Sequence, residues 1–123
     1  MKKMLYLMSL VALLFCYSCN SSESGGKKEQ FLSFCKERMK IYEEGIDKML
    51  AAEYPDEFYR ICQVYNRRLE DSTKKASNSL SEEECLKLYE SDADVEKAFD
   101  ELKIVEAKFY NIMYDKKLEF GMN

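Results

Sequence analysis

The chain contains no histidine and no tryptophan, and it has one proline and four glycines among its 123 residues. The absence of histidine removes the usual general base, the commonest metal ligand and every nucleophile pair that uses an imidazole. The scarcity of proline and glycine after residue 30 leaves no internal linker, and no segment alternates apolar and polar residues for long. These absences predict a single all-α domain without a recognisable catalytic motif.

Metal-binding patterns are missing as well. The three cysteines beyond the first 20 residues are 27 and 23 positions apart, without the close pair typical of zinc sites or disulfide exchange. Asp92, Asp94 and Glu96 imitate the opening of a calcium loop, but Lys97 stands where glycine is required. We therefore expect no metal and no cofactor, and we predict that the protein is not an enzyme.

An excess of basic residues is also lacking. The chain has 19 basic and 23 acidic residues, for a net charge of −4. Without Lys2 and Lys3, 17 basic residues remain against the 23 acidic ones, and the net charge becomes −6. An acidic domain without a dominant basic face is a poor candidate for binding nucleic acid, so no nucleic-acid partner is expected.

Long apolar runs are confined to the N-terminus. Lys2 and Lys3 precede the apolar run Met4–Tyr17, which is followed by Ser18 and Cys19. A run of about 14 residues is too short for a membrane span, which needs roughly 20. The order of charged, apolar and small residues is typical of an export signal.

The end of this segment resembles the signal of bacterial lipoproteins, in which small residues precede a cysteine that receives a diacylglyceryl group. Cys19 matches the modified residue and Ser18 the small residue before it, whereas Cys16 and Tyr17 depart from the pattern. The resemblance implies lipidation of Cys19 and a membrane anchor, with Asn20 favouring the outer membrane of the bacterial cell envelope. The alternative is ordinary cleavage after Ser18 and a secreted protein.

The predicted organisation then has three parts. Residues 1–18 form the signal peptide, residues 19–29 the lipidated cysteine and a flexible tether, and residues 30–123 one helical domain. The tether assignment depends on the polar, Gly/Ser-rich composition that follows Cys19. About 95 residues after it are enough for one modest core.

Apolar residues recur every three or four positions through this domain, which predicts helices over 27–52, 55–77, 81–90 and 92–119. Pro55 fits a first helical turn, and Ser81 with Glu84 forms a capping-box pattern. The expected fold is a small up-down antiparallel bundle of three long helices and one short helix. Gly45 indicates either a close approach of another helix or a neutral substitution that the helix tolerates. Leu32, Ile41 and Leu50 form an additional apolar flank, which packs either inside the bundle or against a second copy of the chain in a dimer.

Three cysteines remain in the domain: Cys35, Cys62 and Cys85. In an antiparallel hairpin, Cys35 and Cys62 differ in height by roughly 16 Å at 1.5 Å per residue, beyond the roughly 7 Å that a bridge spans. Cys85 falls near the height of Cys35, so we predict a Cys35–Cys85 disulfide, favoured by the oxidising conditions that exported domains meet. The alternative is three buried thiols that act as small apolar residues.

One basic stripe stands out on the second predicted helix, and its members form the predicted interaction patch: Arg60, Arg67, Arg68, Lys74 and Lys75. Its plain interpretation is a solvated face paired with acidic neighbours, and its functional interpretation is a contact for an acidic protein or for lipopolysaccharide phosphates. Tyr59 and Tyr114 lie off the apolar stripes and are expected to be exposed.

Together these features predict a non-enzymatic, lipid-anchored envelope protein whose helical bundle binds a protein partner. Immunity-type lipoproteins have a similar layout. The alternative from another class is an exported carrier of a small apolar ligand, held between helices around Phe58, Phe99 and Phe109.

Overall fold

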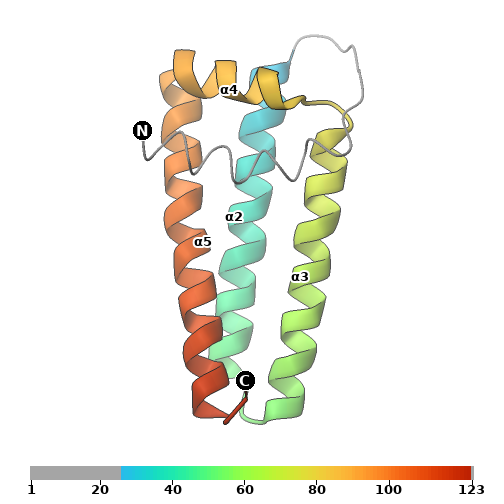
Figure 1. Cartoon of the computed structure of the whole chain (residues 1–123), viewed down its shortest axis with the longest axis vertical. Coiled ribbons are helices and arrows are strands. Elements are labelled where there is room, and N and C mark those ends of the chain that lie inside the picture. Colours follow the sequence, from blue (N-terminus) through green and yellow to red (C-terminus); the bar gives the residue numbers. More distant parts are fainter. Residues whose placement is uncertain (1–25, 123) are drawn as a thin grey trace.

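A computed structural model describes residues 26–122 and shows an all-α bundle, as predicted. Three long helices stand side by side, and one short helix crosses the end at which two of them begin (Figure 1). Their bounds are α2 Lys27–Ala51, α3 Pro55–Ser77, α4 Glu82–Ser91 and α5 Ala93–Glu119. The predicted signal peptide, Cys19 and the first part of the predicted tether lie outside the described residues.

Successive long helices are antiparallel, so α2 and α5 run in the same direction and α3 runs in the opposite direction (Figure 1). In the bundle, α2 lies between α5 and α3 (Figure 1). The largest interface nevertheless joins this parallel pair, and the contact of α2 with α3 comes second. Contacts at three heights fix the register of α2 against α5. They join Lys28 to Asp94, Tyr42 to Glu106, and the carbonyl of Ala52 to Lys116.

The helix ends follow the local signals in the sequence. Pro55 occupies the first turn of α3, where its missing N–H is not needed. Ser81 accepts a hydrogen bond from the backbone N–H of Glu84, whose carboxylate accepts one from the N–H of Ser81, completing the predicted capping box. Asp92 caps α5 by accepting from the two amides that follow in its first turn.

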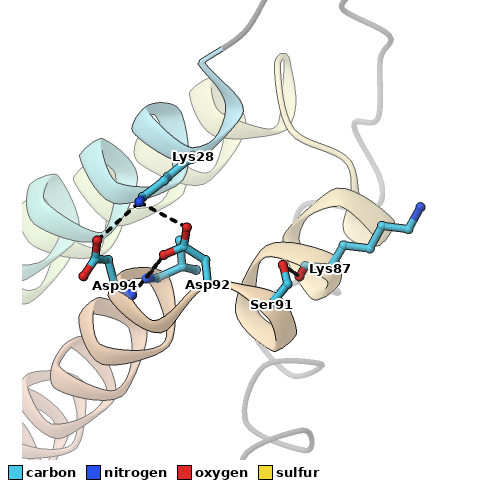
Figure 2. A network of polar contacts seen from close by, with 6 residues as sticks. Lys28, Lys87, Ser91, Asp92 and Asp94 are labelled. Atoms are coloured by element: carbon cyan, nitrogen blue, oxygen red, sulfur yellow. Dashed lines mark hydrogen bonds and ion pairs between the residues drawn. The ribbon is translucent and has the colours of Figure 1, made fainter.

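α2 begins three residues before the predicted boundary of the domain at residue 30. Gly26 precedes it with a φ of 96°, a left-handed conformation that glycine adopts without strain. Lys28 reaches across to the start of α5, where its Nζ lies 3.1 Å from Asp92 Oδ2 and 3.2 Å from Asp94 Oδ2 (Figure 2). These ion pairs hold the first turn of α2, which overlaps the predicted tether, against the start of α5.

Aromatic rings fill the core in three clusters along the bundle. Their members are Phe31, Phe34, Phe99 and Tyr89 near α4, Tyr42, Phe109 and Tyr110 at mid-height, and Phe58 and Phe120 near the opposite end. At mid-height α2 contributes Gly45, where an added Cβ would lie 2.6 Å from Phe109 and 3.3 Å from Tyr65. Gly45 therefore marks a close approach of both neighbouring helices to α2.

The apolar flank predicted on α2 does not form one face. Ile41 is buried, Leu32 is half-buried and Leu50 is exposed. Leu32 lines a groove against α5, whereas Ile41 lines one against α3. Among residues 26–122, no helix has the length and apolarity that crossing a bilayer requires.

Candidate interaction surface between α2 and α3

The predicted basic patch lies entirely on α3, but its members have different surroundings. Arg60, Arg67 and Lys74 are exposed along one flank. Arg60, Arg68 and Lys75 line hollows that α3 forms with α2, whereas Arg67 and Lys74 line none of these hollows. The structure thus brings only part of the patch together with residues of a second helix.

Three open hollows follow the line between α2 and α3, which we call the α2–α3 groove. The hollow nearest α4 has a volume of about 260 Å³, and Gln30, Ser72 and Lys75 are among its lining residues. The next has about 200 Å³ and shares Ser72 and Lys75. The third, of about 350 Å³, is lined by Arg60 with apolar residues of α3. The groove therefore offers both basic and apolar contacts over most of the length of α3.

Arg68 is held in place at the middle of this groove. Its Nη1 lies 2.9 Å from Glu44 Oε1, and its guanidinium lies over the Tyr65 ring, 5.0 Å from the centroid. The hydrogen bond from Arg68 lowers the pKa of Glu44, so this pair stays ionised in mildly acidic solution. Arg68 is consequently committed to α2 and less available to a partner than the sequence suggested.

The other four basic residues of the patch, unlike Arg68, form no ion pair with another residue within the described part of the chain. They are Arg60, Arg67, Lys74 and Lys75. The expected pairing with the acidic neighbours on α3 is therefore not formed there. These four basic groups form no ion pair there, and acidic residues line the same hollows: Glu29, Glu37 and Asp71 beside Lys75, and Glu57 beside Arg60.

Two polar atoms in the hollow nearest α4 lack hydrogen-bond partners. They are Oε1 of Gln30 and Oγ of Ser72, and both atoms are inaccessible to solvent. Ser72 as a residue is only 4% exposed. Buried polar atoms in native proteins nearly always have a partner, because leaving one unpaired costs about 1–3 kcal/mol. Both residues line the hollow, but because these two atoms are inaccessible, a group bound there reaches them only after their side chains turn.

A buried polar network behind the groove joins all three long helices. Arg38 is 4% exposed and donates to the carbonyl of Leu69, to Thr73 Oγ1 at 2.8 Å and to the Tyr42 hydroxyl at 3.0 Å. The Tyr42 hydroxyl in turn donates to Glu106 Oε2 on α5 at 3.1 Å. Nε of Arg38 has no partner. The network fixes the position of α3 relative to α2 and so sets the shape of the groove.

Nucleophilic chemistry is not favoured at the titratable groups of the core. Burial raises the pKa of Cys35 and of Cys85 to about 12, and it also raises the pKa of Cys62 and of Tyr42. A thiol with a raised pKa stays protonated near neutral pH and reacts slowly. Among residues 26–122, no group of His, Cys, Asp or Glu side chains is arranged to hold a metal ion.

The predicted cysteine pair lies together in the core near α4. All three described cysteines are free thiols and buried. Cys85 is close enough to Cys35 to contribute to its raised pKa, after burial, whereas the charge that acts on Cys62 comes from Lys117 at the other end of α5. The structure does not form the Cys35–Cys85 bridge, which stays a prediction.

The rings named for a ligand carrier are packed against other rings. Phe58, Phe99 and Phe109 are each 0% exposed. None of the three lines a hollow described above, and each belongs to a different aromatic cluster. The carrier alternative stays a prediction, and no observation at these rings favours it.

Comparison of the chain with protein-family models, with curated proteins and with solved structures found no match. The site must therefore be interpreted from its residues. Sequence reasoning missed Arg38, Gln30 and Ser72. For Arg38 a signal existed, because it lies four residues from both Phe34 and Tyr42 on the same apolar stripe. For Gln30 and Ser72 there was none, since an unpaired atom depends on the neighbouring helix.

Proposed function

We propose that this protein is a non-enzymatic, lipid-anchored module of the bacterial cell envelope that binds a protein partner through the α2–α3 groove. Support for the anchor comes from the leader and from the match of Cys19 to the lipidated residue of lipoprotein signals. The outer membrane is the proposed location, on the basis of Asn20. Support for the binding surface comes from the groove itself.

The observation that carries the binding proposal is the hollow nearest α4, where Lys75 forms no ion pair within residues 26–122 and Gln30 and Ser72 contribute polar side chains. Lys75 attracts a carboxylate, and Gln30 and Ser72 can hydrogen-bond to a partner once their side chains turn toward the hollow. A protein segment with an acidic side chain next to a free backbone amide fits this lining. The remaining cations on α3 would then extend the contact toward further acidic residues of the partner.

The position of this hollow restricts the partner. Seven residues, 20–26, separate Cys19 from the start of α2, and an extended chain of that length spans at most about 25 Å. The end of the bundle that carries α4 therefore stays near the lipid surface. We infer that the partner is itself a protein of the envelope that presents its acidic segment close to the membrane.

Photo-crosslinking in cells that express the full-length protein tests this proposal. A photoreactive amino acid replaces Lys75 in one variant and Asn66 in a second. Asn66 is a matched control, because it is also exposed on α3 but does not line the groove. We expect a protein adduct of one defined mass at position 75 only. The charge reversals Arg67→Glu and Lys74→Glu should reduce its yield.

The result has clear opposing outcomes. Equal yields of adduct at positions 75 and 66 would show that the crosslinks arise from nonspecific collisions. An adduct with lipopolysaccharide would show that the basic residues bind phosphate groups instead of a protein. Mass spectrometry of the same membranes tests the anchor separately. An acylated Cys19 is expected, and a soluble chain that begins at unmodified Cys19 would contradict the anchor without bearing on the groove.

A further inference from the structure

A second groove begins at a hollow between α2 and α5, and apolar side chains continue from it along both helices at heptad spacing. We call it the α2–α5 groove. Its apolar residues are Leu32, Met39 and Ile46 on α2, and Ala98, Val105 and Ile112 on α5. All except Ile46 are only partly buried. A repeat of seven residues on both helices is the pattern that packs against further helices in coiled coils.

The parallel register places these residues in layers. The three contacts that fix the register join positions that differ by 66, 64 and 64. A residue of α2 therefore lies at the height of the α5 residue roughly 65 positions later. Leu32 is level with Ala98, Met39 with Val105, and Ile46 with Ile112. Successive layers are about 10 Å apart at 1.5 Å per residue.

A hollow lies at the first layer, beside the small side chain of Ala98. It has a volume of about 460 Å³, and its lining includes Leu32, Met39 and Ala98. Its surface is mostly apolar. A side chain of leucine size entering from outside would contact both helices and remove this apolar surface from water.

Charges of opposite sign flank the layers at matching heights. Lys36 on α2 is level with Glu101 on α5, and Glu43 on α2 is level with Lys108 on α5. All four side chains belong to exposed residues, and none forms an ion pair within residues 26–122. The groove is thus apolar along its centre and carries a charge pattern that is complementary to itself.

We propose that the α2–α5 groove binds the same groove of a second copy of this chain, with the two bundles parallel. A two-fold axis along the bundle then places α2 of one copy against α5 of the other at equal height. Leu32 enters the hollow beside Ala98 of the second copy. Lys36 meets Glu101 and Glu43 meets Lys108 across the interface. The four helices form a joint core, and both α2–α3 grooves remain open.

The parallel orientation rests on the lipid anchor of the proposed function. An antiparallel pair would also match charges, because Lys36 would meet Glu43 of the second copy. The start of one α2 would then lie about 37 Å farther from the lipid surface, the length of a 25-residue helix. A tether of seven residues reaches at most about 25 Å. Only the parallel pair allows both anchors to enter one membrane.

Cysteine crosslinking between two differently tagged full-length copies in membranes tests this inference. One copy carries Lys36→Cys and the other Glu101→Cys, so an intramolecular bridge does not score. Mild oxidation with copper phenanthroline should give a dimer that carries both tags. Cys35, Cys62 and Cys85 are buried and contribute little background. Asn66→Cys with Lys74→Cys on α3 is the matched control for collision and should give no such dimer.

The outcomes separate the arrangements. A dimer between Lys36→Cys and Glu43→Cys copies, in place of Glu101→Cys, would overturn the parallel orientation. Equal crosslinking in the control pair, or none in any pair, would overturn the interface. If the expected dimer forms while mass spectrometry finds no acyl group on Cys19, the anchor fails and the interface stands.

A second measurement avoids introduced cysteines. Ala98→Met fills the hollow, whereas Ala107→Met adds the same side chain at an exposed position of α5 that lies outside it. Sedimentation of the detergent-extracted protein should show a dimer for wild type and for Ala107→Met. Ala98→Met should raise the dimer dissociation constant about tenfold, with helical content unchanged by circular dichroism. An Ala98→Met protein that dimerises as tightly as wild type would contradict the interface.

Discussion

Phe109 packs directly against the backbone of α2 at Gly45, so that a Cβ at position 45 would lie 2.6 Å from Cε2 of its ring. The ring is fully buried and cannot swing away. Glycine inside a helix normally costs about 1 kcal/mol relative to alanine, but here it permits the close approach of α5.

We therefore predict that Gly45→Ala lowers the free energy of unfolding by about 1–3 kcal/mol, because overpacking outweighs the gain in helix propensity. Urea unfolding followed by circular dichroism measures the change. Asn66→Ala, at an exposed position of α3, is the control and should change the free energy by less than about 0.5 kcal/mol. A more stable Gly45→Ala protein would show that the helices separate easily at this point.

The buried arginine gives a second prediction. Arg38→Ala removes three hydrogen bonds and leaves a cavity, and it should cost about 3 kcal/mol of stability. Arg38→Met keeps most of the volume and removes a guanidinium whose Nε has no partner, so it should cost about 1 kcal/mol or less. Equal losses for the two variants would mean that the charge itself, not the packing, holds α3 in place. The exposed Arg67→Ala serves as control.

The thiols and buried tyrosines predict a loss of stability in alkaline solution. Burial raises the pKa of Cys35 and Cys85 from 9.0 to about 12, and burial raises the pKa of Tyr42 and Tyr89 above 10.0. The unfolded chain ionises first, so these groups favour folding fully below pH 9 and progressively less as the pH rises toward the folded-state values.

Urea unfolding at a series of pH values from 8 to 11 tests the alkaline prediction. The test uses reduced protein. In the triple variant Cys35→Ala/Cys62→Ala/Cys85→Ala only the tyrosines remain among the groups with a raised pKa, so the onset of the loss should move from about pH 9 to about pH 10. An onset at pH 9 that persists in the triple variant would assign the effect to other groups.

The cysteine arrangement gives a fourth prediction. Protein from the envelope should carry a Cys35–Cys85 disulfide, because both thiols are buried toward the α4 end of the bundle, whereas Cys62 is in the first half of α3, toward the opposite end. Alkylation of the unfolded protein without reduction should label Cys62 alone, and after reduction all three cysteines. The bridge closes a loop of about 50 residues and should contribute about 4 kcal/mol in the chain-entropy model. Labelling of all three thiols without reduction would favour three structural thiols.

The helix bounds were predictable from the sequence because their signals are local. Pro55, the Ser81–Glu84 box and Asp92 each act within one turn of chain, and the observed helices begin at or next to the predicted positions. The predicted tether, 19–29, overlaps the first turn of α2, where Lys28 is held by residues that follow it by more than 60 positions. Contacts between residues so far apart in the chain cannot be recognised from the sequence of a single helix.

The candidate site was predictable only in outline. The basic stripe followed from heptad spacing on α3, but the commitment of Arg68 to Glu44 depends on how α2 lies beside it. Periodicity shows which face of a helix is buried and not which neighbour covers it. The dominant pairing of α2 with α5, and hence both grooves, could not be derived from the separate stripes.

The parallel pairing of α2 with α5 also governs the order in which the chain can fold. The main interface joins segments separated by roughly 65 residues, so its loop-closure entropy must be overcome before its contacts form. An emerging chain that has completed α2 and α3 still lacks the partner for the most buried side of α2. The largest interface of the fold can therefore form only after the last helix has been synthesised.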